Sequence, residues 1–460
     1  MINSAVSKEE QHRRMGSEPI PRLILSFALP AIIGMIAGAI YNIVDRIFVG
    51  RYVGSVGLAA ITVSFPMMMM LMAFTLLICV GGASRVSILF GANRRRPAEQ
   101  ALTTTFVLLA IVGAASIAAS FFAVDAMLRL SGASGEVLEM ARPYLRIILL
   151  GAPLGLFGFG ANFLVRASGN PRFAMCTQIV GAVSNVILDA FFIITLDMGV
   201  AGAAYGTVLA QAVSAVFGLS FFWRREAPLR IRAHFIGLPR WDVFKRICAV
   251  GSAPFFMELS FVCYMTLMNQ LIIKYGGDAG LSAMGIFLSL DSLLFLPAMA
   301  IGEASQPIIG YNYGAGMPKR VIKAIYCALG MAVGFYVISF TLAEIFAGPM
   351  MRLFTNDEAL LAIGVPGMRV GYIGLPFMGV TIVTNSALQG LGKGFASLAL
   401  SFCRHVLCMF IPLIMLPRIF GLLGVWMSFP CGDVGGCVIS LGFLVWTIRW
   451  LKSPAALAVK

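Results

Sequence analysis

Ionisable side chains interrupt long apolar stretches of this sequence. Six of them are carboxylic acids: Asp45, Asp189, Glu258, Asp291, Glu303 and Asp433. A charged carboxylate in apolar surroundings costs free energy unless it is paired, protonated or bound to a cation. Each of these acids is therefore a candidate for ion binding or proton exchange. Basic groups at similar places lie nearer the ends of the stretches: Arg46, Arg85, Arg404 and His405.

Two of the acids stand beside other oxygen-bearing side chains. Tyr41 and Asp45 are four residues apart, as are Asn185 and Asp189, so each pair shares one face of a helix. Thr207 adds a hydroxyl in a nearby apolar stretch. Two carboxylates, an amide and a hydroxyl can hold a small hard cation through oxygen. Alternatively, two close carboxyl groups can share a proton.

A structural interpretation of the same acids stays open. Asp45 can neutralise the adjacent Arg46, and Asp189 can cap a neighbouring helix. Neither arrangement would involve ion coupling.

The other acids have alternative interpretations too. Glu258, four residues after Pro254, is predicted to bind a cationic substrate or to form a second coupling site; the structural alternative is an ion pair with a basic helix end. Asp291 is predicted to attract cationic compounds. We expect Glu303, close to the end of its stretch, to be structural, and the role of Asp433 stays open.

The composition identifies the elements that must position these groups. Hydrophobic residues make up 59% of the 460-residue chain, charged residues only 12%, and the mean hydropathy is +0.91. Soluble domains carry about 25% charged residues, so a water-soluble enzyme is excluded. The runs are too long and continuous for a β-barrel. We predict an all-α membrane protein with twelve transmembrane helices, at approximately 22–49, 57–83, 101–124, 143–166, 173–196, 199–223, 243–272, 281–309, 322–348, 364–390, 397–416 and 422–449.

The basic residues predict the orientation. One side of the predicted membrane holds 23 Lys and Arg and the other side eight. The side with the excess is expected to be cytoplasmic, which places both termini and the long 224–246 loop there. The net charge of +14 then reflects topology rather than nucleic-acid binding.

The two halves of the chain repeat each other. Pro30 recurs as Pro254, and Asn162 recurs as Asn385, at nearly constant spacing across six helices. An even number of helices makes the repeats parallel. We therefore predict two pseudo-symmetric six-helix lobes around a central cleft that opens to each side in turn. The expected parts are a cytoplasmic tail (1–21), an N-lobe (22–223), a cytoplasmic linker (224–242), a C-lobe (243–449) and a second cytoplasmic tail (450–460).

Motifs for catalysis are missing. The sequence has no GxxxxGK[ST] phosphate loop, no HExxH and no GxSxG. We expect neither enzymatic activity nor a cofactor.

Several motifs together resemble the MATE (multidrug and toxic compound extrusion) family, nearer its MepA-like and DinF-like members than its NorM type. They cover nearly the whole chain and include Tyr41-Asn-Ile-Val-Asp45, Leu164-Val-Arg-Ala-Ser-Gly169, Asn185-Val-Ile-Leu-Asp189 and Gly310-Tyr-Asn-Tyr-Gly-Ala315. The resemblance implies an antiporter that expels cationic, amphipathic compounds in exchange for H⁺ or Na⁺.

The resemblance also assigns residues. In relatives with this pattern the cation site falls on Asp45, Asn185, Asp189 and Thr207, with Tyr41 alongside. Glu258 matches a NorM-type glutamate, whereas the aspartate that completes the NorM C-lobe site has no counterpart between 362 and 394. No metal is expected beyond Na⁺ at the coupling site.

The predicted function is thus multidrug efflux by a monomer in the bacterial cytoplasmic (inner) membrane, with membrane lipid and small cationic substrates as partners and no nucleic acid. A flippase for lipid-linked precursors is the first alternative. A membrane receptor or scaffold without transport is the second.

Overall fold

The computed structural model describes residues 14–224, 227–236 and 241–454, and in these ranges every regular element is helical. The long helices follow the apolar stretches closely. Their bounds are α2 (Ile20–Tyr52), α3 (Ser55–Gly91), α4 (Arg95–Phe122), α5 (Val124–Leu130), α6 (Gly135–Ala167), α7 (Pro171–Asp189), α8 (Gly199–Trp223), α9 (Trp241–Gly314), α10 (Pro318–Arg352), α11 (Glu358–Tyr372), α12 (Leu375–Gly390), α13 (Gly394–Phe402), α14 (Ile411–Phe420) and α15 (Leu422–Lys452). Two π-helical segments, η1 (Ala190–Thr195) and η3 (Cys403–Phe410), and the 3₁₀-helix η2 (Ala233–Phe235) complete the order.

The helices supply the twelve predicted membrane crossings. Within the described ranges, ten helices are long and apolar enough to cross a membrane, or eleven if α11 and α12, bent by 47°, form one crossing. At 1.5 Å per residue, the 74-residue α9 would be about 110 Å long, far more than the roughly 30 Å of a hydrocarbon core. It is interrupted at Gly277, whose φ of 60° and ψ of −158° are not helical. Counting α9 as two crossings brings the total to twelve.

The chain divides into two compact units, which do not follow the lobes predicted from the repeat residue for residue. Unit 1 contains the described residues up to Glu18 together with Leu29–Gly251. Unit 2 contains Pro19–Ala28 together with the described residues from Ser252 onward. The first residues of α2 thus belong to unit 2 and the rest to unit 1.

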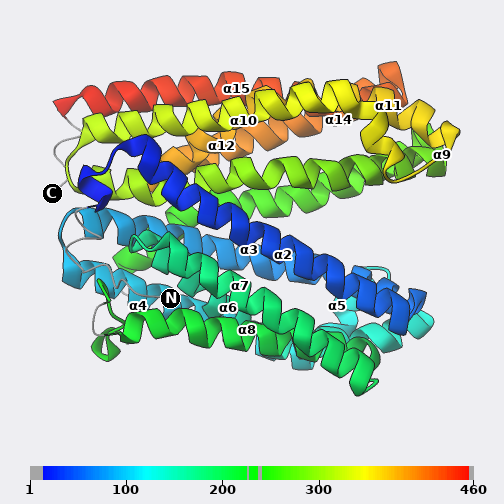
Figure 1. Ribbon diagram of the computed structural model, residues 1–460, viewed down its shortest axis with the longest axis horizontal. Helices are drawn as coiled ribbons and strands as arrows, with labels where there is room; N and C mark the ends of the chain where they lie inside the picture. The colour runs from blue at the N-terminus through cyan, green and yellow to red at the C-terminus, as the bar shows by residue number, and fades with distance from the viewer. Residues whose placement is uncertain (1–13, 225–226, 237–240, 455–460) are drawn as a thin grey trace. The chain divides into compact units, whose positions relative to one another are not determined.

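Helix α6 is the central helix of unit 1. It packs against α3, α4, α7 and α8, as Figure 1 shows for this blue-to-green part of the chain. Glycines on α6 permit the close approach: a Cβ at Gly151 would overlap the Val208 side chain, and one at Gly155 would lie 2.5 Å from Gln211 Oε1. Small residues at helix contacts are expected in a membrane bundle, where van der Waals packing stabilises association.

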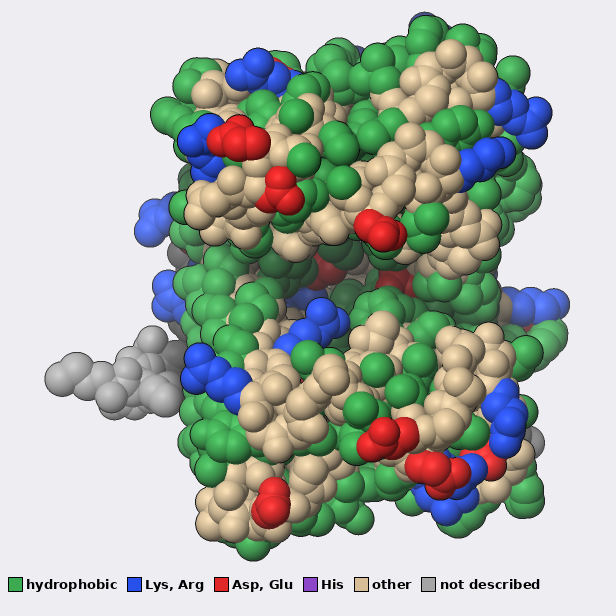
Figure 2. Space-filling view, turned by 90° about the vertical axis from the view of Figure 1, so that its right-hand side faces the viewer, with side chains coloured by type: hydrophobic (Ala, Val, Ile, Leu, Met, Phe, Trp, Pro, Cys, Tyr) green, Lys and Arg blue, Asp and Glu red, His purple; other side chains and the backbone are tan. Residues whose placement is uncertain are grey.

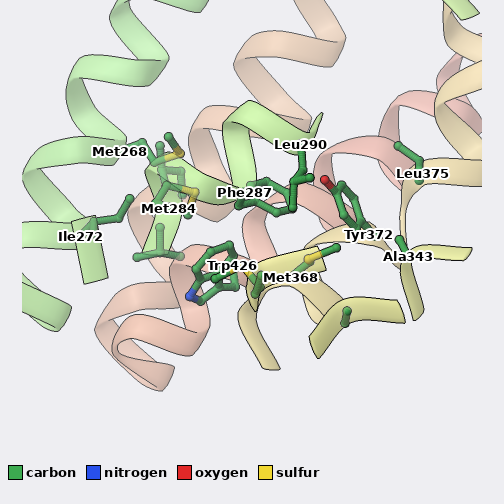
Figure 3. Packing of buried hydrophobic residues seen from close by; sticks show 14 of the residues in the cluster. Met268, Ile272, Met284, Phe287, Leu290, Ala343, Met368, Tyr372, Leu375 and Trp426 are labelled. Atoms are coloured by element: carbon green, nitrogen blue, oxygen red, sulfur yellow. The ribbon is translucent and has the colours of Figure 1, made fainter. Parts of the chain in front are cut away.

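Unit 2 has an aromatic core. Phe287, Tyr372 and Trp426 pack together there with Met368 and Met284, and all five are almost fully buried (Figure 3). The Phe287 ring lies 4.7 Å from that of Tyr372 and 5.3 Å from that of Trp426, centroid to centroid. These contacts join residues of α9, α11 and α15 and so position the polar groups that the same helices carry.

The loop after α8 is held against unit 1 by one buried acid. Glu99, with 3% of its side chain exposed, lies one turn into α4. Its carboxylate accepts hydrogen bonds from Arg232 Nε at 2.9 Å, Arg95 Nε at 3.3 Å and the backbone N–H of Arg230 at 3.2 Å. Leu229, which directly precedes Arg230 in the sequence, is fully buried. Residues 227–232 of the predicted linker are therefore packed against the first turns of α4.

The end of unit 1 that carries α5 has its own ion pair. Arg142 donates to both carboxylate oxygens of Asp125, at 2.7 and 3.1 Å, and to Glu139 at 2.8 Å. The hydrogen bond from Arg142 lowers the pKa of Asp125 below its usual value. Figure 2 looks onto this end of the helices and shows acidic and basic side chains among polar groups and backbone.

Candidate functional site

Helices α2 and α7 bring Asp45 and Asp189 together in unit 1. A Cβ at Gly34 of α2 would overlap the side-chain amide of Gln178 on α7, so the two helices touch there. Asp45 lies eleven residues after Gly34, and Asp189 eleven residues after Gln178. Eleven residues are three helical turns. Two helices that run in the same direction and meet at the first pair therefore meet again at the second.

The two carboxyl groups lie within hydrogen-bonding reach of each other. Asp189 is fully buried and Asp45 is partly buried. Asn185, one turn before Asp189, donates from Nδ2 to Asp189 Oδ1 at 3.3 Å. Two carboxyl groups can share a hydrogen bond only when one of them carries a proton.

Three buried oxygens of this group have no hydrogen-bond partner: Asp45 Oδ1, Asn185 Oδ1 and Asp189 Oδ2. Buried acceptors without a partner are rare, because each loses its hydration without compensation. Two carboxylate oxygens and one amide oxygen are the donor set that a small hard cation prefers. The residues present thus fit either a proton or Na⁺.

Helix α8 packs against Asp189 at the end of α7. A Cβ at Gly206 would overlap Asp189 Oδ1, and one at Gly202 would lie 3.0 Å from the Phe192 carbonyl. The hydroxyl of Ser214, further along α8, donates to the carbonyl of Thr177 on α7 at 3.1 Å. The two helices therefore pack antiparallel, and glycine is needed opposite Asp189.

Thr207 follows Gly206 on α8 and is half-buried. Its hydroxyl makes no hydrogen bond to another described residue. The structure thus places Thr207 next to the glycine that contacts Asp189, without a direct bond to either carboxyl group.

The α-helical pattern of α7 ends at Asp189. The next six residues, Ala190–Thr195, form the π-helix η1. A π-helical segment is rare and often accompanies a functional site, because the wider turn releases regular backbone pairing. The predicted span 173–196 gave no sign of it.

Two tyrosines complete the surroundings. Tyr41, one turn before Asp45 on α2, and the buried Tyr144 of α6 are both close enough to interact electrostatically with Asp45 and Asp189. The sequence pattern indicated Tyr41 but not Tyr144. An uncharged tyrosine next to Pro143 has no local signal, and only the packing of α6 against its neighbours places it there.

The structure bears on the structural alternative for Asp45 only in part, because Arg46 still acts electrostatically on the Asp45 carboxyl group. Across the residues that the structure describes, Asp45 and Arg46 form no ion pair, and Arg46 is exposed. Asp45 also lies beside the carboxyl group of Asp189. Asp189 ends its own α-helix rather than capping another.

The acids of unit 2 do not form one group with Glu258. Glu258 and Asp291 are both half-buried on α9, but the charged neighbour of Asp291 is Asp433 of α15. Asp433 accepts a hydrogen bond from Arg404 Nη2 at 3.4 Å, with 14% and 8% of the two side chains exposed. Arg404 comes from the π-helix η3. The sequence left the role of Asp433 open; the structure makes it the partner of a buried arginine.

Both halves of the chain match the model of one protein family. The model of the MatE family matches two segments of the chain, residues 30–191 and 254–414. The chain is a member of the MatE family. The two matches begin at Pro30 and Pro254, the positions at which the sequence repeat begins, so each half of this MatE protein carries one copy of the family pattern.

Two curated relatives of this MatE transporter come from staphylococci. The multidrug export protein MepA of Staphylococcus aureus (strain NCTC 8325 / PS 47) is 25% identical over 444 residues, covering 96% of this chain and 97% of MepA. MepA of Staphylococcus saprophyticus is 24% identical over the same length. The chain is thus a multi-pass membrane protein with bacterial export proteins as relatives.

Solved structures of MatE proteins share the fold. A crystal structure of a MATE point mutant superimposes with a TM-score of 0.90 at 26% identity, covering 95% of this chain and 98% of that one. An outward-facing multidrug resistance MATE transporter gives a TM-score of 0.90 at 25% identity, covering 98% and 99%. The all-α membrane fold predicted for the MatE chain is confirmed.

Proposed function

We propose that this MatE transporter exports cationic, amphipathic compounds in exchange for H⁺ or Na⁺. The observation that carries the proposal is the close pair of Asp45 and Asp189, whose buried oxygens have no partner apart from Asn185 and each other. A carboxyl pair of this kind binds one positive charge at a time, because two adjacent carboxylates repel each other strongly in a medium of low dielectric constant.

The chemistry of the exchange follows from that pair. Binding of a proton or Na⁺ removes the repulsion between the two carboxyl groups and lets α2 and α7 pack closely at this level. Loss of the ion restores the repulsion and favours a different arrangement of α2, which Pro30 already allows to bend. The bound ion thereby biases a conformational equilibrium, which is what coupling requires.

Substrate recognition is assigned to acids of unit 2. Glu258 and Asp291 are half-buried and have no ion-pair partner among the described residues, so they attract cations from an apolar environment. The name of MepA as a multidrug export protein supports the export of drug-like compounds. We infer that transport proceeds by alternating access of the two predicted lobes, as a monomer.

The proposed location is the bacterial cytoplasmic membrane with both termini in the cytoplasm. The bacterial relatives and the 23-to-eight distribution of Lys and Arg support it. No observation on the site favours the flippase alternative, and the named relatives are export proteins.

Efflux of an ethidium-like dye from proteoliposomes tests the proposal. A pH gradient and a sodium gradient are imposed in separate experiments with the purified protein. Accelerated efflux under one of them identifies the coupling ion. Equal dye flux with either gradient and with none would contradict coupling.

A further inference from the structure

Unit 1 carries a group of arginines where α3 meets the start of α9. A Cβ at Gly81 would overlap the carbonyl of Ile247, and a Cβ at Gly251 would overlap the carbonyl of Leu77. The two backbones therefore touch at two levels one turn apart, and the helices run antiparallel. One turn beyond Gly81, α3 carries Arg85, which lies level with the first turns of α9.

Two more arginines come to the same place. Arg246 precedes Ile247 on α9, and Arg94 directly precedes α4, after a turn in which Asn93 has a φ of 55°. The backbone N–H of Arg94 donates to the carbonyl of Leu89, one turn after Arg85 on α3, at 2.9 Å, and Arg94 and Arg246 both act electrostatically on Arg85. Arginines from the end of α3, the turn before α4 and the start of α9 thus lie near one another, and we call them the arginine cluster (Arg85, Arg94 and Arg246).

No ion pair neutralises the arginine cluster within the part of the chain that the structure describes, although Asp242 lies one turn before Arg246 on α9. None of its three members forms an ion pair with an acid there. Arg85 Nε is buried and has no hydrogen-bond partner. Like charges held together, with a buried donor left unpaired, cost free energy unless an anion neutralises them.

The start of α4 adds to the attraction for an anion. This helix begins at Arg95, has no side-chain cap and no acidic residue in its first turn. Free backbone N–H groups and the positive end of the helix dipole at such a terminus favour a compact anion with several oxygens, above all a phosphate. Arginine suits the same ligand because its planar fork binds two phosphate oxygens at once.

The depth of the arginine cluster indicates where the phosphate comes from. Helix α3 has 37 residues, about 55 Å, so its ends extend beyond a hydrocarbon core of roughly 30 Å. Arg85 lies six residues before the end of α3 at Gly91, within about 9 Å of that end. Trp241, at the start of α9 and 63% exposed, is the residue type found at the headgroup layer. The distance of Arg85 from the middle of α3 and the exposed Trp241 favour the headgroup layer, where lipid phosphates lie, as the level of the cluster.

We propose that Arg85, Arg94 and Arg246 bind the phosphate of an anionic phospholipid in the leaflet that faces this end of unit 1. Basic pockets between transmembrane helices bind such headgroups elsewhere. The lipid neutralises the arginine cluster and links the ends of α3, α4 and α9. It acts apart from the carboxyl pair, so its binding does not depend on the proposed antiport.

Titration of detergent-solubilised protein with phosphatidylglycerol tests the proposal, with binding read out by native mass spectrometry and thermal shift. Arg85→Gln is expected to weaken binding about fivefold, and the triple change Arg85→Gln/Arg94→Gln/Arg246→Gln about 100-fold. Arg85→Lys keeps the charge but loses the two-pronged contact, so its affinity should fall between wild type and Arg85→Gln.

A matched control separates this site from charge in general. The triple variant Arg172→Gln/Lys319→Gln/Lys323→Gln removes the same charge from basic residues outside the arginine cluster. It should bind within about twofold of wild type. Equal losses in the two triple variants, or equal binding of phosphatidylcholine, would overturn the proposal. Stabilisation by inorganic phosphate alone to the same extent would also overturn it, because the ligand would then be a soluble phosphate.

Discussion

Replacement of Gly206 by alanine tests the geometry around Asp189 without touching a charged group. A Cβ at this position would overlap Asp189 Oδ1 and would lie 3.1 Å from the Asp189 backbone nitrogen. Either the carboxyl group moves or α7 and α8 separate. Overpacking of this kind costs about 1–3 kcal/mol, whereas alanine in a helix is favoured over glycine by about 1 kcal/mol. The net loss in folding stability should therefore be small.

We expect Gly206→Ala to lower the transport rate clearly even though the free energy of unfolding changes little. A penalty of about 1–3 kcal/mol placed on the arrangement of Asp189 corresponds to a roughly 5- to 150-fold fall in a rate that requires this arrangement. Dye efflux from proteoliposomes with equal amounts of inserted protein measures that rate, and thermal unfolding of the same samples measures stability.

Gly158→Ala is the matched control in unit 1. The nearest atom to a Cβ at Gly158 would be the backbone nitrogen of Ala215 at 3.5 Å, an ordinary contact. This variant should transport like wild type. If Gly206→Ala also transports at the wild-type rate, the approach of α8 to Asp189 has no part in function and our interpretation of the site is wrong.

Three further predictions concern the ion pairs. Glu99→Gln weakens charged hydrogen bonds of a buried carboxylate, so unfolding should cost about 1–3 kcal/mol less, and trypsin should cut the 227–236 loop faster; unchanged cleavage would contradict this. Asp433→Asn leaves Arg404 buried without its partner and should destabilise by about 3–5 kcal/mol in thermal unfolding, with part of the loss recovered in the double variant Asp433→Asn/Arg404→Met; no recovery would show that the pair does not act as a unit. Because Arg142 lowers the pKa of Asp125 in the folded protein, this stabilisation is complete above the unfolded pKa of about 4 and disappears as the pH falls through the folded value. The melting temperatures of wild type and Asp125→Asn should therefore differ at pH 7 and converge in acid, and a gap that stays constant with pH would refute the assignment.

The course of the helices was predictable because hydropathy reports contact with lipid. The predicted span 57–83 lies inside the helix Ser55–Gly91, and 322–348 lies inside Pro318–Arg352. The additional turns extend beyond the apolar core, where helical structure continues without a hydropathy signal. The same limitation explains why the π-helices at Ala190–Thr195 and Cys403–Phe410 were not predicted: their composition is ordinary for a membrane helix.

The contents of the site were only partly predictable. The spacing of Asn185 and Asp189 predicted a shared face, and the structure joins them by a hydrogen bond. The approach of Asp45 to Asp189 depends on two helices far apart in sequence, so spacing could not establish it and the family resemblance supplied it. Tyr144 carries no charge in an apolar run and became visible only through packing.

The buried Arg404 shows a similar limit in unit 2. The sequence placed Arg404 near a helix end, because an arginine without a partner is costly inside a membrane. Its partner Asp433 is 29 residues further on, in the next membrane crossing. The fold brings the two side chains together, and no local sequence pattern predicts an ion pair between two helices.

We propose that Asp45 and Asp189 couple ion movement to export. Asp45→Asn and Asp189→Asn each remove a carboxylate while preserving size, and Asp197→Asn makes the same change at an exposed position between α7 and α8. Gradient-driven dye efflux from proteoliposomes should be lost in the first two variants and retained in the third. Efflux at the wild-type rate by both Asp45→Asn and Asp189→Asn would show that the carboxyl pair does not couple ion movement to export.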